Sequence, residues 1–320
     1  MLTPPENFPA LRVLQLTSPL SLRASGADVD SFLQGQLTGD LRQLTSDQAI
    51  WSAYCSPKGR MLAAPLLLRN GADVELWLPQ NLLEPVLKRL RMFVLRAKVQ
   101  LEAPASTSMS LSIDGHQAAD WIAAQAWPVP AHVLQVSTAP GLRIVRLPGI
   151  TPRFLAIGAA TASVALPQDS LLGGEAALLA WREADIRAGV PRVDLDTQDR
   201  WVPQMANLDL LGGISFDKGC YTGQEVVARL HYLGNLKKRL FLLQGAGEAP
   251  QPGGTIRDSA GQSAGDVVDA VALPGGAGFV ASAVMQLSAL DTDLFLEGAP
   301  PRALLQRPVA YAYGGDRARY

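Results

Sequence analysis

The alternation of apolar and polar residues predicts a compact α+β unit over residues 11–101. Asp28 can cap a helix whose inward face carries Val29, Phe32, Leu33 and Leu37. A longer helix is expected after residue 78, with apolar side chains at helical spacing up to Phe93 and Val94. The strands are expected over 11–16, 50–54, 61–68, 73–78 and 97–101, with a tight turn at Asn70-Gly71. The order is close to a split βαβ pattern with an extra hairpin strand.

The rest of the chain predicts two further segments. Strands over 109–113, 133–136, 142–147 and 154–157 and a helix over 174–188 give a second α+β segment, and Gly189 and Pro191 end that helix. After residue 236, short apolar runs alternate with Pro-Gly-Gly turns at 252–254 and 274–276, which indicates a small β-barrel. The expected domains are 1–105, 106–235 and 236–320, with a linker over 102–108.

Composition bounds the function classes. The 320 residues are 48% hydrophobic and 18% charged, with a net charge of −1, so no global field would attract nucleic acid or an anionic membrane. The basic residues cluster locally at Lys88, Arg89, Arg91, Arg96 and Lys98. We favour a solvated helix face for this cluster over a contact with RNA or with an anionic ligand tail.

The cysteines and histidines are too few for a metal centre held by this chain alone. There are two cysteines and three histidines, without a CxxC pair or two histidines at ligand spacing, so no metal site is expected. Two isolated thiols fit a reducing compartment. The N-terminus lacks the charged and apolar regions of a signal peptide, and the apolar run 61–68 is too short to span a bilayer. We therefore expect a soluble, cytoplasmic monomer without a membrane partner.

Residues 201–235 carry the candidate chemistry. Gly219 and Gly223 bracket a sharp turn that lets the backbone approach another group closely. If the stretch is extended, Lys218 and Cys220 project to the same side, where the ammonium group would favour the thiolate. Glu225 would oppose this effect if it came close. A small buried thiol that packs a turn is the alternative for Cys220.

A family resemblance favours the functional alternative. Residues 218–225, Lys-Gly-Cys-Tyr-Thr-Gly-Gln-Glu, resemble the signature of the YgfZ family. Outlying motifs follow in family order at 32–40 (Phe-Leu-Gln-Gly-Gln-Leu-Thr-Gly-Asp), 55–60 (Cys-Ser-Pro-Lys-Gly-Arg), 188–191 and 203–208. An eight-residue signature with ordered outlying motifs is far more specific than a lone glycine pattern.

The resemblance implies an aminomethyltransferase-like α+β fold that binds tetrahydrofolate, with a C-terminal β-barrel. It implies that Cys220 and Lys218 are the functional pair and that Trp181 lies near the folate, where an indole can stack on a pterin. Without the resemblance, core packing is the simpler role for Trp181. The other residues expected to bind the cofactor are Gln204, Asn207, Tyr221, Gln224, Glu225 and Arg229.

Two departures from the related aminomethyltransferases shape the expected function. Their acidic pair aligns with Ala63-Ala64 here, which removes the carboxylate that would steer the reacting nitrogen. An aromatic side chain that contacts the folate in some members is not evident near Pro19-Leu20.

The resemblance implies an accessory protein for 4Fe–4S enzymes, including tRNA methylthiolation enzymes, with Cys220 acting transiently. A folate-dependent one-carbon transferase or demethylase and an RNA-binding module are the alternatives.

Overall fold

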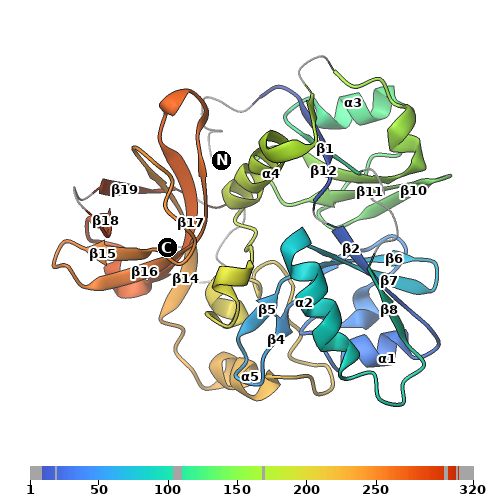
Figure 1. Cartoon of the computed structure of the whole chain (residues 1–320), viewed down its shortest axis with the longest axis horizontal. Helices are drawn as coiled ribbons and strands as arrows, with labels where there is room; N and C mark the ends of the chain where they lie inside the picture. Colours follow the sequence, from blue (N-terminus) through green and yellow to red (C-terminus); the bar gives the residue numbers. More distant parts are fainter. Residues whose placement is uncertain are drawn as a thin grey trace. The chain divides into compact units, whose positions relative to one another are not determined.

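The structure is a computed structural model that describes residues 9–18, 20–103, 110–167, 170–298, 302–307 and 309. The N-terminal residues 1–6, Pro19 and most of the expected linker 102–108 lie outside this set. The chain divides into two compact units, and Figure 1 labels the helices and strands that compose them. The first contains residues 1–32, 41–50 and 66–181, and the second contains 33–40, 51–65 and 182–320. The expected division into three consecutive domains stays a prediction.

A six-stranded sheet forms one half of the first unit. Its strand order is β10 (Val136–Ala139), β11 (Leu142–Leu147), β12 (Arg153–Gly158), β9 (Ser110–Asp114), β1 (Arg12–Leu16) and β13 (Leu171–Leu172). Helix α3 (Ala118–Ala124) packs on it through Ala118 and Ile122, which share a core with Ile113 and Phe154. The helix was not predicted, because its single apolar turn is too short to show a helical period.

A five-stranded sheet forms the other half of the first unit. Its order is β3 (Ile50–Trp51), β6 (Leu66–Asn70), β7 (Asp73–Leu78), β2 (Leu20–Ser25) and β8 (Gln100–Glu102). Helix α2 (Gln80–Arg91) lies against β2 and β8 and buries one apolar stripe, whereas α1 (Val29–Gln34) begins directly after Asp28. The predicted hairpin at Asn70-Gly71 is confirmed, with φ +61° at Gly71.

Three predictions for the N-terminal region are wrong. Residues 12–16 join the six-stranded sheet beside β9 and β13, and the strand that fills their expected place is β2. The expected strand 50–54 is broken into β3 and a second short strand, β4 (Tyr54–Cys55). Helix α2 ends at Arg91, so Phe93 is exposed instead of packing inward. Local alternation identifies a strand but does not identify its partner in the sheet.

The second unit contains the expected β-barrel, which is confirmed as a closed six-stranded barrel. Its strands follow the order β14 (Lys238–Gly245), β17 (Phe279–Gln286), β16 (Ser263–Ala272), β15 (Thr255–Asp258), β18 (Leu294–Leu296) and β19 (Arg302–Arg307). Because the sheet closes on itself, each of the described barrel strands has a neighbouring strand on both sides. Phe241, Ile256, Phe279 and Met285 are among the apolar side chains that fill the interior.

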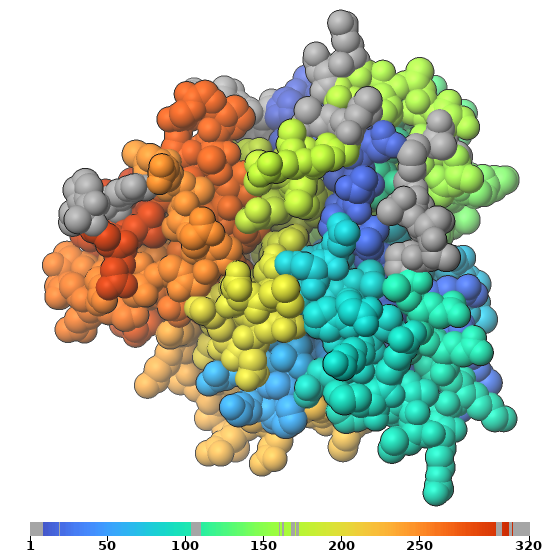
Figure 2. Space-filling view, viewed as in Figure 1, coloured from blue at the N-terminus to red at the C-terminus, as the bar shows by residue number. Residues whose placement is uncertain are grey.

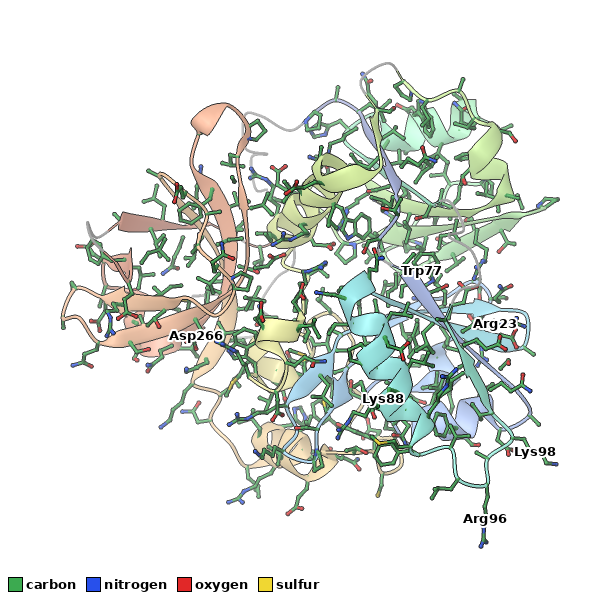
Figure 3. The ribbon with its side chains drawn as sticks, in the orientation of Figure 1. Arg23, Trp77, Lys88, Arg96, Lys98 and Asp266 are labelled. Atoms are coloured by element: carbon green, nitrogen blue, oxygen red, sulfur yellow. The ribbon has the colours of Figure 1, made fainter. Side chains whose placement is uncertain are left out.

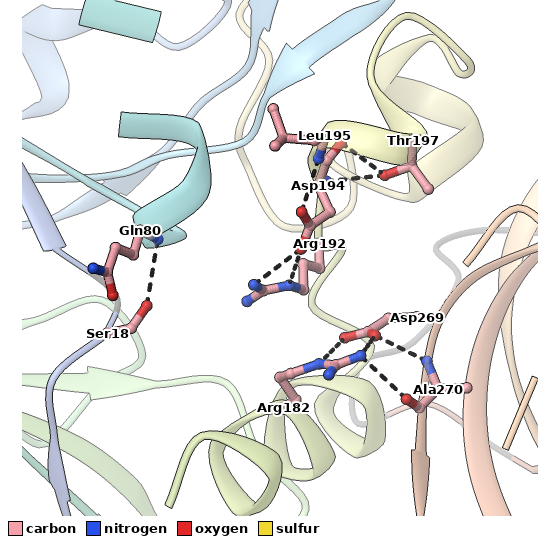
Figure 4. Close-up of polar contacts among 9 residues, drawn as sticks. All are labelled: Ser18, Gln80, Arg182, Arg192, Asp194, Leu195, Thr197, Asp269 and Ala270. Carbon is pink, nitrogen blue, oxygen red and sulfur yellow. Dashed lines mark hydrogen bonds and ion pairs between the residues drawn. The ribbon is translucent and has the colours of Figure 1, made fainter. Parts of the chain in front are cut away.

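Helix α4 (Gly174–Ala188) is confirmed and ends where its sequence predicts, with Gly189 at φ +71°. From the middle of this helix Arg182 forms an ion pair with Asp269 on β16, and Asp269 is almost fully buried (Figure 4). Arg192 pairs with Asp194, which also caps the short helix η3 (Leu195–Thr197). These two arginines fix the chain that leads from α4 toward the signature.

Smaller elements complete the second unit. A two-stranded ribbon joins β4 (Tyr54–Cys55) to β5 (Met61–Ala63), and helix α5 (Gln224–Tyr232) follows the signature loop.

The remaining 3-10 helices of the described chain are distributed over both units. They are η1 (Leu41–Gln43), η2 (Ala159–Ser163), η4 (Pro203–Ala206), η5 (Pro274–Gly276) and η6 (Leu287–Ala289). Within the described ranges, no helix is both long and apolar enough to cross a membrane.

Candidate functional site

The signature residues 218–225 form a loop that runs directly into α5. Gly223 stands at the N-cap of this helix with φ +83°, a left-handed conformation that favours glycine. The backbone N–H of Gln224 donates to the carbonyl oxygen of Tyr221 at 3.1 Å, which closes the loop as the helix begins. The loop therefore has a defined conformation, although helix α5 was not predicted from the sequence.

Lys218 anchors this loop to the motif at residues 32–40. Its Nζ donates to the carbonyl oxygens of Leu37 at 2.7 Å and Gly39 at 2.6 Å, and only 7% of the residue is exposed. The ammonium also lies 5.3 Å from the ring centroid of Tyr221, within the range of a cation–π interaction. A buried ammonium group needs such partners, because removal from water is costly.

A second set of bonds fastens the same motif to the approach to the signature. The hydroxyl of Thr38 donates to the carbonyl oxygen of Gly213 at 2.6 Å, and the N–H of Ser215 donates to the carbonyl oxygen of Thr38 at 2.9 Å. Thr38 is completely buried. Thr38 therefore binds a segment about 175 positions later in the chain through both its side chain and its backbone.

The hairpin at residues 55–60 packs against the other end of the signature. A side chain on Gly223 would bring its Cβ to 2.5 Å from the carbonyl oxygen of Ser56 and 2.8 Å from the Cα of Gly59. Gly59 in turn faces Gly223 and Val226. Gly219 differs, since no heavy atom beyond its neighbours lies within 4 Å of its Cβ position. Of the two glycines expected to permit a close approach, only Gly223 does so.

The two cysteines occupy opposite environments. Cys220 is exposed, whereas Cys55 is fully buried on β4. Burial raises the pKa of the Cys55 thiol to about 12, with a smaller contribution from the Asp199 carboxylate. Burial also raises the pKa of Tyr221, and the nearby Cys55 adds to that shift. Cys55 is therefore held protonated, and Cys220 is the accessible thiol of this region.

Lys218 and Cys220 also differ in environment, although only one residue separates them. The Lys218 ammonium is turned to backbone carbonyls inside the unit, while Cys220 lies at the surface. The structure therefore gives the two side chains different surroundings, and the expected effect of the ammonium group on the thiol stays a prediction. Here Lys218 holds the loop that presents Cys220, and a chemical role for either residue stays a prediction.

Gln204 and Asn207 belong to the buried support beneath the signature. The amide nitrogen of Gln204 donates to the carbonyl oxygen of Val227 on α5 at 2.7 Å. Asn207, with φ +60°, donates to the carbonyl oxygen of Leu240 at 2.8 Å and accepts from its N–H at 3.3 Å. Its amide thereby joins η4 to the barrel strand β14, and ligand binding by Asn207 stays a prediction.

Arg239 is a supporting residue that the sequence analysis missed. Its guanidinium forms a two-pronged ion pair with Asp209 at 2.6 and 2.9 Å and donates to the carbonyl oxygen of Gln204 at 3.1 Å. The residue is 5% exposed. The available sequence signal is an arginine at the start of an apolar strand, with an aspartate 30 positions earlier in the chain.

Two of the buried polar atoms near the signature have no hydrogen-bond partner within the part of the chain that the structure describes. They are the hydroxyl of Tyr221 and the Oε1 atom of Gln204, in residues that are 6% and 3% exposed. Most buried polar groups in proteins are paired, so such atoms point to an additional partner. A ligand with both donor and acceptor groups would satisfy them, and the pterin of a folate is such a group.

The other expected cofactor-binding residues have different surroundings. Gln224 is half-buried at the start of α5, and Glu225 and Arg229 are exposed on that helix. Trp181 belongs to the first unit, where it is 5% exposed, and the centroid of its ring lies 4.3 Å from the guanidinium carbon of Arg153.

Among the described residues, no group of three or more potential ligands that could hold a metal ion is found.

The fold is that of an aminomethyltransferase. The crystal structure of glycine cleavage system aminomethyltransferase T from Bartonella henselae matches 93% of this chain and 84% of its own chain, with a TM-score of 0.69 and 18% sequence identity. At this identity the match defines the fold alone. No family model matches the chain.

Curated relatives define the family. The tRNA-modifying protein YgfZ of Escherichia coli O127:H6 is 36% identical over 261 residues, which cover 79% of this chain and 78% of the relative. The protein of the same name from Escherichia coli O157:H7 is 34% identical over 297 residues, covering 90% and 89%. The chain belongs to the YgfZ family.

The two glycines of the signature provide a matched test of the loop. Gly223→Ala should lower the free energy of unfolding by about 2 kcal/mol or more, because it combines a positive φ with a backbone clash. Gly219→Ala should change it by no more than about 0.5 kcal/mol, because its Cβ position is open. Urea denaturation measures both, and equal losses would contradict the close packing of Gly223 on the hairpin.

Proposed function

We propose that this protein binds tetrahydrofolate and assists the assembly or repair of 4Fe–4S clusters in particular enzymes. The tRNA methylthiolation enzymes would be among these clients, which would connect the protein to tRNA modification. The observation that carries the proposal is the exposed thiol of Cys220 on a loop fixed by Lys218 and Gly223. A fixed, accessible thiol suits a contact with a partner.

Cys220 would act as a transient ligand or nucleophile toward a client. A cluster held by one chain generally needs four thiolate or imidazole ligands, and this chain has two cysteines, one of them buried. One accessible thiolate is enough to touch a cluster, a sulfur species or a cysteine of the client. Lys218 would contribute by holding the loop.

Tetrahydrofolate is proposed as the ligand on two grounds. The aminomethyltransferase fold is one that uses folate, and the unpartnered Tyr221 hydroxyl and Gln204 Oε1 suit the polar edge of a pterin. When bound, a reduced folate supplies a carrier for one-carbon units. Trp181, Gln224, Glu225 and Arg229 complete the proposed contacts from the family resemblance.

A one-carbon transferase or demethylase is the second candidate. Ala63 and Ala64 are buried, and they replace the acidic pair of the aminomethyltransferases. General-base assistance typically contributes 10²–10⁴-fold, so its loss disfavours that transfer reaction. Formation of methylene-tetrahydrofolate by the purified protein would favour this candidate, from an aminomethyl donor with release of ammonia or from an N-methyl donor with an added two-electron oxidant. We further propose a cytoplasmic monomer whose partners are the folate and the client proteins.

Loss of the exposed thiol tests the role in Fe–S maturation. In a strain that lacks the gene, Cys220→Ser should leave the methylthiolation of tRNA at the level of the deletion, whereas the wild-type gene restores it. Cys55→Ala is the control, because that thiol is sealed inside the protein and should be dispensable once normal protein levels are confirmed. Full restoration by Cys220→Ser would remove the thiol from the mechanism.

The Tyr221 hydroxyl tests the folate proposal separately. Tyr221→Phe should weaken tetrahydrofolate binding about tenfold, because one hydrogen bond to the ligand is lost. It should leave stability unchanged or slightly higher, because it removes an unpaired buried hydroxyl from the folate-free protein. Titration followed by tryptophan fluorescence measures the affinity, with Trp181→Leu in parallel. A wild-type protein that shows no response to tetrahydrofolate would exclude the ligand.

A further inference from the structure

The segment that follows α2 exposes apolar and basic side chains together. Met92, Phe93 and Leu95 are exposed to 59%, 40% and 85%, so this stretch carries three large apolar residues in water. Lys88, Arg91, Arg96 and Lys98 surround them in the sequence and are also exposed. We call residues 88–98 the basic–apolar tip. None of its side chains takes part in the site described above.

The basic–apolar tip is held in a defined conformation. Successive turns join the N–H of Phe93 to the carbonyl oxygen of Leu90 at 3.0 Å and the N–H of Val94 to that of Arg91 at 3.2 Å. At its far end, the N–H of Lys98 donates to the Asp28 carboxylate at 2.7 Å. The guanidinium of Arg91 donates to the carbonyl oxygen of Leu101 at 2.7 Å. The apolar side chains are therefore displayed by an ordered loop.

The cations of the tip outnumber the one carboxylate that contacts it among the described residues, which belongs to Asp28. Within the part of the chain that the structure describes, Lys88, Arg91, Arg96 and Lys98 form no ion pair. Between Glu84 and Glu102 the sequence contains no acidic residue. The tip therefore presents a local positive charge, although the whole chain has a net charge of −1. An anionic partner would complement it.

The tip also projects from the surface of its unit. Figure 3 shows Arg96 pointing away from the ribbon at the end of the loop that follows α2, with Lys98 beside it. In Figure 2 the same teal segment carries a side chain that stands clear of the atoms around it. A convex feature of this kind can reach a flat surface without a shaped pocket on the partner.

We propose that the basic–apolar tip docks the protein reversibly on an anionic phospholipid surface. Lys and Arg would contact the lipid phosphates, while Leu95, Phe93 and Met92 enter the boundary between headgroups and acyl chains. A nucleic acid offers the same phosphate charge but no apolar layer for an aliphatic side chain such as Leu95. The apolar residues therefore favour lipid over RNA.

The net charge of −1 led to the expectation that the protein has no membrane partner, but the local charge of the tip is what acts at a lipid surface. Steering by a global field requires a large net charge, whereas lipid contact depends on charges within about one Debye length of the surface, roughly 8 Å at physiological salt. Docking through a loop is also independent of a membrane-spanning helix. Association of this kind is expected to be weak and to depend on salt.

Vesicle co-sedimentation of the full-length protein tests the proposal. We expect binding to vesicles of phosphatidylcholine with about a quarter phosphatidylglycerol, little binding to pure phosphatidylcholine, and release as salt is raised. Arg96→Glu and Lys88→Glu should each weaken binding about fivefold or more, because each replaces an attraction to the surface by a repulsion. Leu95→Ser should weaken it about tenfold through lost apolar burial.

Matched controls lie on the second unit. Lys237→Glu changes an exposed cation and Leu305→Ser an apolar residue exposed to 57%, and neither should alter vesicle binding. Circular dichroism melting checks that every variant is folded. The proposal is overturned by absence of binding to the anionic vesicles, or by binding that Leu95→Ser leaves unchanged. It is also overturned if transfer RNA binds the tip more tightly than lipid and the same variants abolish that binding.

Discussion

The arrangement of the candidate site depends on the ammonium group of Lys218 and the two carbonyl oxygens that it meets. A buried cation is tolerated only where polar groups replace its water, and Leu37 and Gly39 supply them at 2.7 and 2.6 Å. These two hydrogen bonds join the motif at residues 32–40 to the signature. It turns the lysine inward, so the thiol two residues later is left at the surface.

Other residues of the second unit stabilise the signature loop. Gly223 lets the loop touch the hairpin that carries Cys55, and Gln204 fastens α5 to η4. Asn207 and Arg239 connect η4 to the first barrel strand. The same packing seals Cys55 and leaves the Tyr221 hydroxyl without a partner. The packing around the signature therefore leaves Cys220 accessible and leaves the Tyr221 hydroxyl and the Gln204 Oε1 atom buried without a hydrogen-bond partner among the described residues.

Much of this could be predicted from the sequence. The barrel, the helix over 174–188 and the hairpin at Asn70-Gly71 carry strong local signals, namely alternating runs, a glycine stop and a tight-turn dipeptide. The motif residues also identified the family. The partner of strand 12–16 and the end of α2 could not be predicted, because strand pairing and the exposure of Phe93 depend on contacts distant in sequence. The contacts of Lys218 with Leu37 and Gly39 could not be predicted either, because spacing alone does not show which carbonyls a lysine can reach.

Chemical labelling of lysines in the native protein tests the inward orientation of Lys218 most directly. An amine-acylating reagent, with sites quantified by mass spectrometry, should modify the exposed Lys58 and Lys237 rapidly and leave Lys218 protected until the protein is unfolded. A thiol reagent in the same sample should modify Cys220 without unfolding. Acylation of Lys218 as fast as that of Lys58, or protection of Cys220, would contradict the proposed architecture of the site.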